Sequence, residues 1–387
     1  MRILFVNEKC GYFGGIEQNV ADTAAGLRGR GHQCFLAFQE ATGRQMSEFQ
    51  RGFEQCLPMM PFAECVKSVR PDVIYMHKVN LRGMGGAPAG ARTIRMIHDH
   101  DLCCPRRHKY YAWNGRICHV QAGWRCYLDL AFLGRAPGPQ KIALVSIGEK
   151  LGEMRENRRL SLLLVGSAAM RAELIQNGFA EDDVDTLPPV VLMPLRELTP
   201  IPRENRILYV GQLIRGKGVD LLLRALAHVA SDYELTIVGT GNARVKLEQL
   251  CAKLGLEKRV RFAGWVNPDG LGEYYRSAKV VAVPSRWPEP FGMIGLEAMH
   301  YGRPVVAFNV GGIPDWLEHG ITGLLVAEQD VGAMARALEQ LLGDAERCAQ
   351  LGRQAQERVR ARFSFENYLD RLEAFLWGRP LACEPPQ

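Results

Sequence analysis

The segment from Pro284 to Met299, PSRWPEPFGMIGLEAM, follows an apolar strand and sets two glutamates eight positions apart. The prolines on either side of Glu289 hold it in a non-helical loop, because proline restricts its own backbone and that of the preceding residue. Gly292 frees the backbone to begin a helix, and Glu297 is expected about two turns along it. The first-turn amides of Gly292, Met293 and Ile294 would point, unpaired, at a ligand.

Strands and helices alternate on both sides of this segment. In the second half we predict strands at 206–210, 235–238, 260–263, 280–283, 305–308 and 324–326, a helix at 219–230, and helices after 330. The first half is predicted to have strands at 2–6, 33–38, 73–76, 93–97 and 160–165, and helices at 16–30, 137–158 and 168–177. Such alternation predicts α/β architecture with parallel sheets, whose ligands bind beyond the carboxyl ends of the strands.

A run of prolines marks the boundary between the halves, at positions 188, 189, 194, 200 and 202. We predict an N-terminal Rossmann-like domain at 1–190, a linker at 191–204 and a second Rossmann-like domain at 205–360. The remaining 361–387 is predicted to be a helix and tail, with the helix packing back toward the first domain. The active site is expected in the cleft between the two domains.

The composition is that of a globular protein, with 47% apolar and 23% charged residues in 387. The net charge of +6 is modest, and the absence of a basic-aromatic motif argues against nucleic acid as a partner. No apolar run is long enough to span a bilayer, and the short one at the N-terminus fits a strand better than a signal peptide. With eleven cysteines expected to be reduced thiols, we predict a cytoplasmic protein.

A second glycine-rich segment, VGQLIRGKGVD at 210–220, follows a strand and opens a helix. Its glycines allow the backbone to approach a ligand closely, and Lys217 supplies a point charge for a diphosphate. Together with the glutamate pair, this segment resembles the retaining glycosyltransferase family 4, of GT-B fold, over about 206–342. The family usually has an arginine where this chain has Gln212. Arg215 either compensates for it or is a solvent-facing cation.

The resemblance implies a nucleotide-diphosphate sugar donor, of UDP or GDP type, and no cofactor or metal. It implies that Glu289 contacts the donor sugar, that Glu297 contacts the ribose, and that Lys217 takes the diphosphate charge. Trp265 either stacks on the base or packs in the protein. The full donor-binding set is predicted to be Gly14, Gly15, Gln212, Arg215, Lys217, Gly239, Trp265, Val266, Glu289, Phe291, Gly292, Met293, Ile294 and Glu297.

Two features of the first half complete the predicted site. Gly14 and Gly15 open the first long helix, where family members carry a turn against the donor phosphates. His98 ends a strand, and family members often have a histidine there near the anomeric carbon; the alternative is a buried core histidine. We therefore predict His98, Lys217 and Glu289 as catalytic. The predicted acceptor-side residues are Asp99, His100, Arg106 and Arg107.

The loop that follows is rich in basic, aromatic and cysteine residues. Cys104, Cys118, His119 and Cys126 could bind zinc, although reduced structural cysteines explain them better. The loop suits an anionic or lipid-linked acceptor, and a basic helix at 141–159 could rest peripherally on a membrane.

The resemblance implies transfer of a hexose to a hydroxyl of a glycan or lipid-linked glycan, with retention, as in polysaccharide or lipopolysaccharide assembly. The diphosphate leaving group would assist deprotonation of the acceptor, so that catalysis rests on charge stabilisation and positioning. The alternatives are a sugar-nucleotide epimerase of the same architecture and an inactive nucleotide-sugar-binding subunit.

Overall fold

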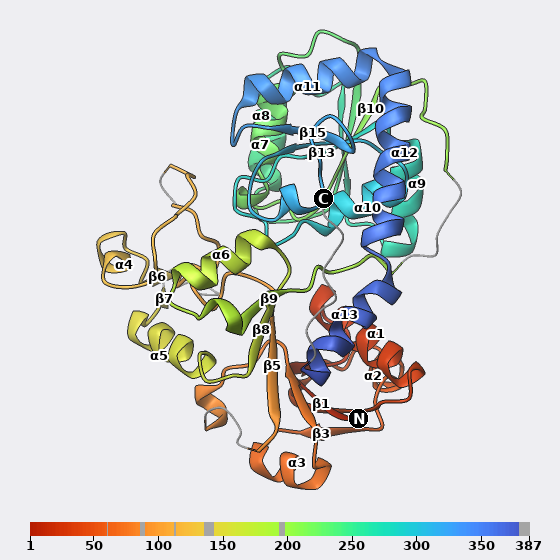
Figure 1. Cartoon of the computed structure of the whole chain (residues 1–387). Coiled ribbons are helices and arrows are strands. Elements are labelled where there is room, and N and C mark those ends of the chain that lie inside the picture. The colour runs from red at the N-terminus through yellow and green to blue at the C-terminus, as the bar shows by residue number, and fades with distance from the viewer. Residues whose placement is uncertain (60, 86–89, 112–113, 135–142, 193–197, 379–387) are drawn as a thin grey trace. The chain divides into compact units, whose positions relative to one another are not determined.

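The computed structural model describes residues 1–59, 61–85, 90–111, 114–134, 143–192 and 198–378. The chain divides into two compact units (Figure 1). Unit 1 comprises Met1–Arg107, Val120–Pro188 and Glu366–Gln387, and unit 2 comprises His108–His119 and Pro189–Phe365. Each unit is therefore assembled from segments that are far apart in the sequence.

Unit 1 is built on a seven-stranded parallel sheet with the order β3-β2-β1-β4-β5-β8-β9. Residues 3–6 of β1 are fully buried, as expected for a central parallel strand covered on both faces. The strands are β1 Arg2–Cys10, β2 Gln33–Ala41, β3 Gln55–Pro58, β4 Val73–Met76, β5 Arg92–Ile97, β8 Leu162–Val165 and β9 Val184–Thr186. β1 is longer than predicted because its polar end still pairs with β2, as far as Cys10 opposite Ala41.

Helices lie on both sides of this sheet, with α1, α2 and α13 on one side and α5 and α6 on the other (Figure 1). Their bounds are α1 Gly15–Gly29, α2 Met46–Gln50, α3 Phe62–Val69, α4 Arg125–Leu128, α5 Ile147–Asn157 and α6 Ala168–Gln176, with turns η1 Arg82–Met84 and η2 Glu181–Asp183. Two short strands, β6 Leu133–Gly134 and β7 Ala143–Leu144, pair antiparallel. The short elements α2, β3, α3 and β9 were not predicted from the sequence.

The helix predicted at 137–158 is present, but the predicted first residue is wrong. Its two prolines lie outside the described residues, Ala143–Leu144 is a strand, and α5 begins at Ile147. The side chain of Ser146 caps this helix by accepting a hydrogen bond from the amide of Glu149 at 3.1 Å. A serine followed three residues later by glutamate is a helix-start pattern, and it decided the boundary.

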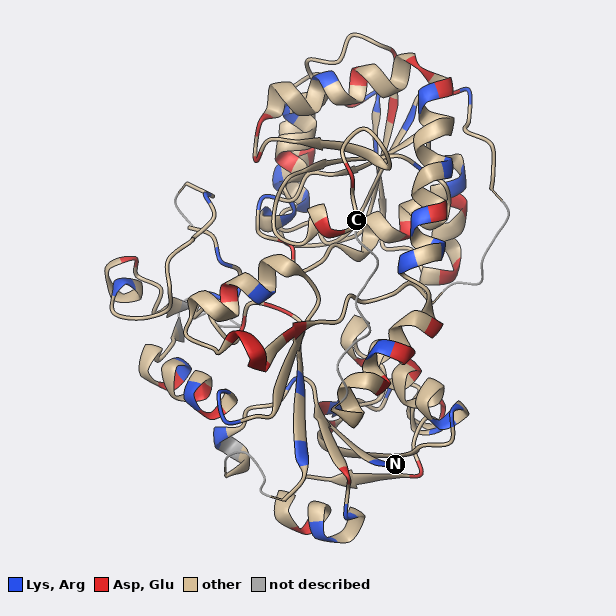
Figure 2. Cartoon of the chain, in the orientation of Figure 1, with Lys and Arg blue, Asp and Glu red and all other residues tan. Residues whose placement is uncertain are grey.

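The helix at this place is also not basic. Acidic and basic residues alternate along α5 (Figure 2), and the acids outnumber the bases: Glu149, Glu153 and Glu156 against Lys150 and Arg155. Two further basic residues, Arg158 and Arg159, follow the helix directly. Among the described residues, no helix combines the length and the apolar character needed to cross a bilayer.

Unit 2 is built on a six-stranded parallel sheet with the order β12-β11-β10-β13-β14-β15. The strands are β10 Arg206–Val210, β11 Glu234–Val238, β12 Val260–Gly264, β13 Val280–Val283, β14 Val305–Phe308 and β15 Gly323–Val326. The helices are α7 Val219–Leu226, α8 Arg244–Lys253, α9 Leu271–Ser277, α10 Met293–His300, α11 Val331–Gly343 and α12 Ala345–Arg362, with turns η3 Arg215–Lys217, η4 Pro268–Gly270 and η5 Ile313–Asp315. All six predicted strands of this half are present.

The last helix, α13 Phe365–Trp377, belongs almost entirely to unit 1. Its Tyr368, Leu369, Leu372, Phe375 and Leu376 are buried. Arg30, just after α1, forms ion pairs with Glu366, Asp370 and Glu373 of this helix at 2.6, 2.7 and 2.6 Å.

Both sheets reverse their strand order at one point, between β1 and β4 in unit 1 and between β10 and β13 in unit 2. In doubly wound sheets the connections leave toward opposite faces at this point, so that a crevice opens beyond the carboxyl ends of the two strands. The residues that follow these strands are therefore where a ligand site is expected in each unit.

Candidate active site

In unit 2 an ion pair lies at the carboxyl end of β13. Lys217, which ends the turn η3, places its Nζ 2.7 Å from Oε1 of Glu289. The hydroxyl of Ser285 donates a further hydrogen bond to the same carboxylate oxygen. Glu289 is only 4% exposed, whereas the Lys217 side chain keeps 20% of its surface open. The structure therefore brings together these two predicted catalytic residues, and the Lys217 side chain keeps part of its surface open to solvent.

Glu289 is ionised despite its burial. Burial alone would raise the pKa of this carboxyl, but the charge of Lys217 and hydrogen bonds from Lys217, Ser285 and Trp287 outweigh it, so the pKa is lowered. The result is a fixed carboxylate beside a cation, which can accept hydrogen bonds from sugar hydroxyls.

Backbone contacts hold the two loops of this pair together. The carbonyl of Gly216 accepts hydrogen bonds from the amides of Arg286 and Trp287 at 2.8 and 3.1 Å. Gly218 adopts φ +66, and a Cβ there would lie 1.9 Å from the carbonyl oxygen of Pro284. Glycine is therefore required at 218, because no other residue permits this approach. Lys217 Nζ also lies 5.1 Å from the centre of the Trp287 ring, within cation–π range.

Helix α10 begins directly after the Glu289 loop, with Gly292 at φ +97 as its N-cap. Met293 and Ile294 supply the first-turn amides, as predicted. Glu297 is only the fifth helical residue, so it lies little more than one turn along α10, not two, because the helix starts after Gly292. Its Oε2 accepts a hydrogen bond from Tyr275 at 2.7 Å, and burial raises its pKa even though this bond lowers it.

Other predicted donor-site residues have structural functions that are visible in the fold. The Phe291 side chain is buried against Phe363, at 5.8 Å between ring centres, so only its backbone remains for a ligand. Gly239 is needed for chain packing, since a Cβ there would lie 1.9 Å from the carbonyl oxygen of Gly211. Val266 is half-buried.

Three predicted residues of unit 2 expose their side chains. Trp265 is 68% exposed, which excludes the packing alternative and leaves its ring available to a planar ligand. Gln212 and Arg215 are also exposed. The carbonyl of Arg215 accepts a hydrogen bond from Arg286 at 3.1 Å.

A hairpin at 108–119, which the sequence assigned to the N-terminal domain, folds with unit 2. Its Gly115 has φ +74, and a Cβ there would lie 2.9 Å from Cδ of Arg286. The Gly115 carbonyl accepts a hydrogen bond from Gln329 at 3.2 Å. Arg286 itself is 6% exposed and pairs with Asp220 at 2.7 Å. The hairpin thus packs on Arg286, which bonds to Arg215 and Asp220 on either side of Lys217. This contact was not predicted from the sequence.

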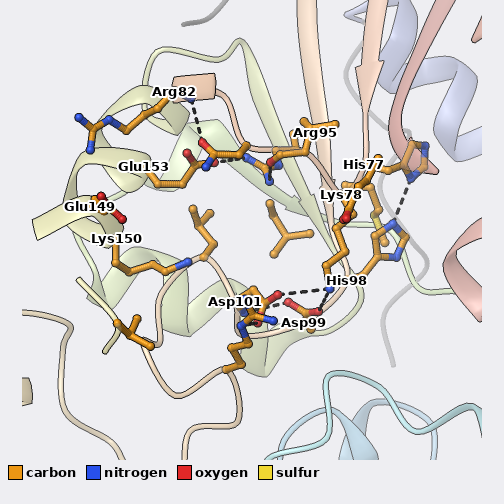
Figure 3. A pocket seen from close by; sticks show the side chains of 18 of the residues that line it. His77, Lys78, Arg82, Arg95, His98, Asp99, Asp101, Glu149, Lys150 and Glu153 are labelled. Carbon is orange, nitrogen blue, oxygen red and sulfur yellow. Dashed lines mark hydrogen bonds and ion pairs between the residues drawn. The ribbon is translucent and has the colours of Figure 1, made fainter. Parts of the chain in front are cut away.

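Unit 1 contains a cavity of about 840 Å³ at the carboxyl ends of β4 and β5 (Figure 3). Of the predicted residues, His98, Asp99 and Arg107 line it. Both basic and acidic side chains line it: Lys78, Arg82, Arg95, Arg107 and Lys150, and Glu8, Asp99, Asp101, Glu149 and Glu153. A cavity of this size lined by hydrogen-bonding groups suits a polyhydroxylated ligand.

An ammonium lies between two carboxylates at this cavity. Lys78 Nζ is 3.2 Å from Oδ2 of Asp99 and 3.2 Å from Oδ2 of Asp101. Burial lowers the Lys78 pKa, but the two aspartates outweigh this effect and raise it. On the opposite wall, buried Arg95 binds Glu153 and Asn157 at 3.1 and 2.6 Å. Lys78, Arg95 and Glu153 were missed from the sequence, because a charged residue on a strand, at a strand end or on a helix gives no signal of the partner it meets.

Two residues predicted on the acceptor side do not line this cavity. His100 is buried and places Nδ1 2.6 Å from Oε2 of Glu173 on α6. Arg106 donates a hydrogen bond to the carbonyl of Asp129. Both were predicted from their position in the polar segment that follows β5. Successive side chains of such a segment point in different directions, so neighbours in the sequence need not reach the same cavity.

Gly14 and Gly15 stand at the start of α1, as predicted. A Cβ at Gly15 would meet nothing within 4 Å, and one at Gly14 would lie 3.6 Å from the Glu17 side chain. Gly14 has an extended φ of −164 that any residue adopts. Packing of the described residues therefore does not require glycine at either position.

The zinc alternative finds no support in the described residues. Cys104, Cys118 and Cys126 are buried. Cys104 and Cys126 belong to unit 1, whereas Cys118 and His119 belong to unit 2. In the part of the chain that the structure describes, no three His, Cys, Asp or Glu side chains are grouped so that they could hold a metal ion.

The fold and these strand-end residues define an α/β protein of two doubly wound units with an anion-compatible site in unit 2. Residues 195–358 match the family model "Glycosyl transferases group 1". The chain belongs to this family, and the match covers the strands and loops that carry Lys217, Glu289 and Glu297.

Relatives and solved structures agree with this assignment. A D-inositol 3-phosphate glycosyltransferase of Nocardia farcinica is 32% identical over 301 residues, 70% of this chain and 66% of that protein. An uncharacterized glycosyltransferase of Methanocaldococcus jannaschii, MJ1607, is 40% identical over 143 residues, so the chain spans only 36% of its length. Anabaena HepE, in complex with UDP and glucose, has a TM-score of 0.72 at 21% identity and covers 98% of this chain and 100% of its own. The fold is GT-B.

Proposed function

We propose that this protein is a retaining glycosyltransferase that moves a hexose from a UDP- or GDP-sugar to a hydroxyl of a glycan or lipid-linked glycan. The observation that carries the proposal is the ionised Glu289 beside the partly exposed side chain of Lys217, inside the segment that matches the family. A carboxylate acceptor and a cation at one strand end suit the two parts of a sugar nucleotide, its hydroxyls and its diphosphate.

In the proposed mechanism Lys217 stabilises the charge that develops on the departing diphosphate, and the first-turn amides of α10 contribute further donors. Glu289 orients the donor sugar through its hydroxyls, and Glu297 binds the ribose. Gly14 and Gly15 admit the donor phosphate to the start of α1. His98 and the cavity of unit 1 contact the sugar or the acceptor. The rate then depends on positioning and on charge stabilisation, without a protein nucleophile.

The test is nucleotide release from a panel of UDP-, GDP- and ADP-sugars. Glu289→Gln and Lys217→Met should each lower release from the active donor by about a hundredfold, the magnitude typical of losing one charge-stabilising group. Glu257→Gln and Lys258→Met are the matched controls, since both residues are exposed in unit 2. Release that persists in both site variants would contradict the assigned site, and NMR of the product's anomeric proton decides retention.

A second acceptor class is a phosphorylated polyol, as in the name of the Nocardia relative. It is favoured by Arg82 and Lys150, which line the unit 1 cavity and form no ion pair with any described residue. Transfer assays with inositol phosphate beside a neutral oligosaccharide separate the two classes. Lys150→Met should reduce transfer to the phosphorylated acceptor alone.

Peripheral membrane contact is also proposed, now through apolar side chains near α4. Trp124 is 68% exposed, Leu128 72% and Leu144 80%, and Arg125 stands beside them. Flotation with anionic liposomes tests this contact, and Trp124→Ser with Leu128→Ser should abolish it. A wild-type protein that stays in solution would contradict it.

A further inference from the structure

Two histidines from neighbouring strands form a pair at the unit 1 cavity. His77 follows β4 and His98 follows β5. Nδ1 of His77 lies 3.0 Å from Nε2 of His98, and the rings are stacked with 5.3 Å between centres (Figure 3). An N···N distance of this size requires that one of the two nitrogens carries a proton and the other does not.

His77 is fixed and has no access to solvent. It is 1% exposed, its ring lies parallel to that of Phe5 at 6.0 Å, and Tyr75 packs on it at 4.5 Å. Its backbone amide donates to the carbonyl of Val6 at 2.8 Å. The ring therefore cannot turn, and its Nδ1 is held in the direction of His98.

His98 is held on one side only. It lines the cavity and is half-buried, and among the described residues His77 is its one hydrogen-bond partner. Its Nδ1 has no hydrogen-bond partner among the described residues, but this atom is not enclosed by the protein. This nitrogen is therefore open to a ligand in the cavity.

Both rings are neutral near pH 7. Burial, then His98 and Arg95, lower the pKa of His77 well below its usual value. Burial lowers the pKa of His98 to about 4, with Lys78 and Arg95 adding to the effect and Asp99 opposing it. The pair consequently shares one proton between Nδ1 of His77 and Nε2 of His98. Whichever of these two nitrogens holds that proton decides whether Nδ1 of His98, which faces the cavity, is protonated.

The buried edge of His77 decides where that proton is. Its Nε2 is enclosed and has no hydrogen-bond partner among the described residues. If His98 were the donor, neutral His77 would carry its proton on Nε2, which would bury an N–H without an acceptor. A buried side-chain donor without an acceptor costs the full desolvation of its N–H group. The arrangement that avoids this cost has the proton on Nδ1 of His77, with Nε2 of His98 accepting the hydrogen bond.

We propose that His77 is a positioning residue that holds His98 as the Nδ1–H tautomer, so that His98 donates a hydrogen bond to an oxygen of the bound substrate. His98 then binds a hydroxyl or ring oxygen of a sugar and does not act as a base. The identity of that substrate rests on the proposed function, whereas the tautomer does not.

The tautomer is measured directly by ¹H–¹⁵N NMR of the histidine side chains in the full chain near neutral pH, with His98 assigned from His98→Gln. We expect a protonated Nδ1 and an unprotonated Nε2 on His98. The reverse pattern would overturn the proposal, whether or not the protein has transferase activity.

Two variants test the positioning role. His77→Phe preserves the stacked ring but removes the donor, and should lower kcat about 10- to 100-fold with little change in KM, the usual range for losing an orienting partner. His77→Asn places an amide donor near the former Nδ1 and should recover most of kcat and the Nδ1–H signal. Wild-type kcat in a folded His77→Phe protein would overturn the role, as would an equal loss in both variants.

Discussion

At the scale of single residues, Glu289 of unit 2 and His98 of unit 1 have different charge states. Glu289 keeps its charge because a cation and several donors surround it. His98 stays neutral because burial and the nearby cations Lys78 and Arg95 disfavour a second positive charge. In both cases the neighbours, not the residue type, set the protonation state.

The depressed pKa of His98 predicts a pH dependence of stability. The unfolded chain binds a proton at this residue near the ordinary value of 6.5, but the folded chain does so only at about 4. Stability is therefore fully present above 6.5 and decreases as the pH falls toward 4. The contribution should be on the order of 1 to 3 kcal/mol. Urea unfolding of wild type and His98→Gln across this range measures it, and parallel curves would contradict it.

At the scale of elements, each unit's site is made by a loop or helix start that follows a strand. Glycines serve two purposes there. Gly218 and Gly239 permit one backbone to approach another, whereas Gly15 faces open space. The first kind is explained by the fold, whereas the predicted donor-binding role of Gly15 needs a test of its own.

Gly15→Ala should separate binding from stability. Alanine is the better helix former, by up to about 1 kcal/mol, so the melting temperature should stay the same or rise. The added methyl group should weaken binding of the donor nucleotide about tenfold, since it occupies the approach to the first-turn amides. Gly29→Ala, at the other end of α1 with equally open space, is the control. Calorimetric titration with UDP and GDP gives the affinities.

Gly115→Ala tests whether the 108–119 hairpin supports the donor site. The new Cβ would press on Arg286, which is bonded to Asp220 and to the Arg215 carbonyl. Nucleotide-sugar affinity should decrease about tenfold or more, because misplacing a positioned cation such as Lys217 weakens its contact. Gly255→Ala has a similar φ of +70 but open space, and so matches the backbone strain alone. Equal affinities in the two variants would show that the hairpin has no effect.

At the scale of the whole molecule, neither compact unit is one continuous stretch of the chain. Unit 1 is completed by α13, which comes from the C-terminal end of the described residues, and unit 2 is completed by the 108–119 hairpin. A fragment cut between the predicted domains would therefore leave both units incomplete.

The contribution of α13 can be measured with two aromatic truncations. Phe375 is 5% exposed and Trp377 is 52% exposed. Phe375→Ala should destabilise the protein by about 3 to 5 kcal/mol, as for a large buried aromatic residue, and Trp377→Ala by clearly less. Thermal unfolding followed by limited proteolysis shows whether unit 1 is the part that opens. Preferential cleavage in unit 2 would contradict the placement of α13.

Much of the fold was predictable because local sequence patterns, such as apolar runs, prolines and glycines, mark most strands and turns. Apolar runs such as Val280–Val283 and Val305–Phe308 gave strands with correct bounds, since fully buried parallel strands need little beyond side-chain type. The Glu289 loop and the Lys217 turn were found because proline and glycine constrain the backbone locally. The start of α5 was missed because Ser146 and two prolines gave competing helix-start signals, and α2 and β3 are too short to show a period.

The sequence by itself determined the α/β class and the bounds of most strands of unit 2, because these depend on neighbours within a few positions. Only the tertiary structure decided which charges meet: Lys217 with Glu289, Lys78 with Asp99 and Asp101, and His77 with His98. It also decided that His100 pairs with Glu173 and that the 108–119 hairpin folds with unit 2. These pairings join residues that are far apart in the sequence and are brought together by the order of the strands in each sheet. The local sequence does not specify that order.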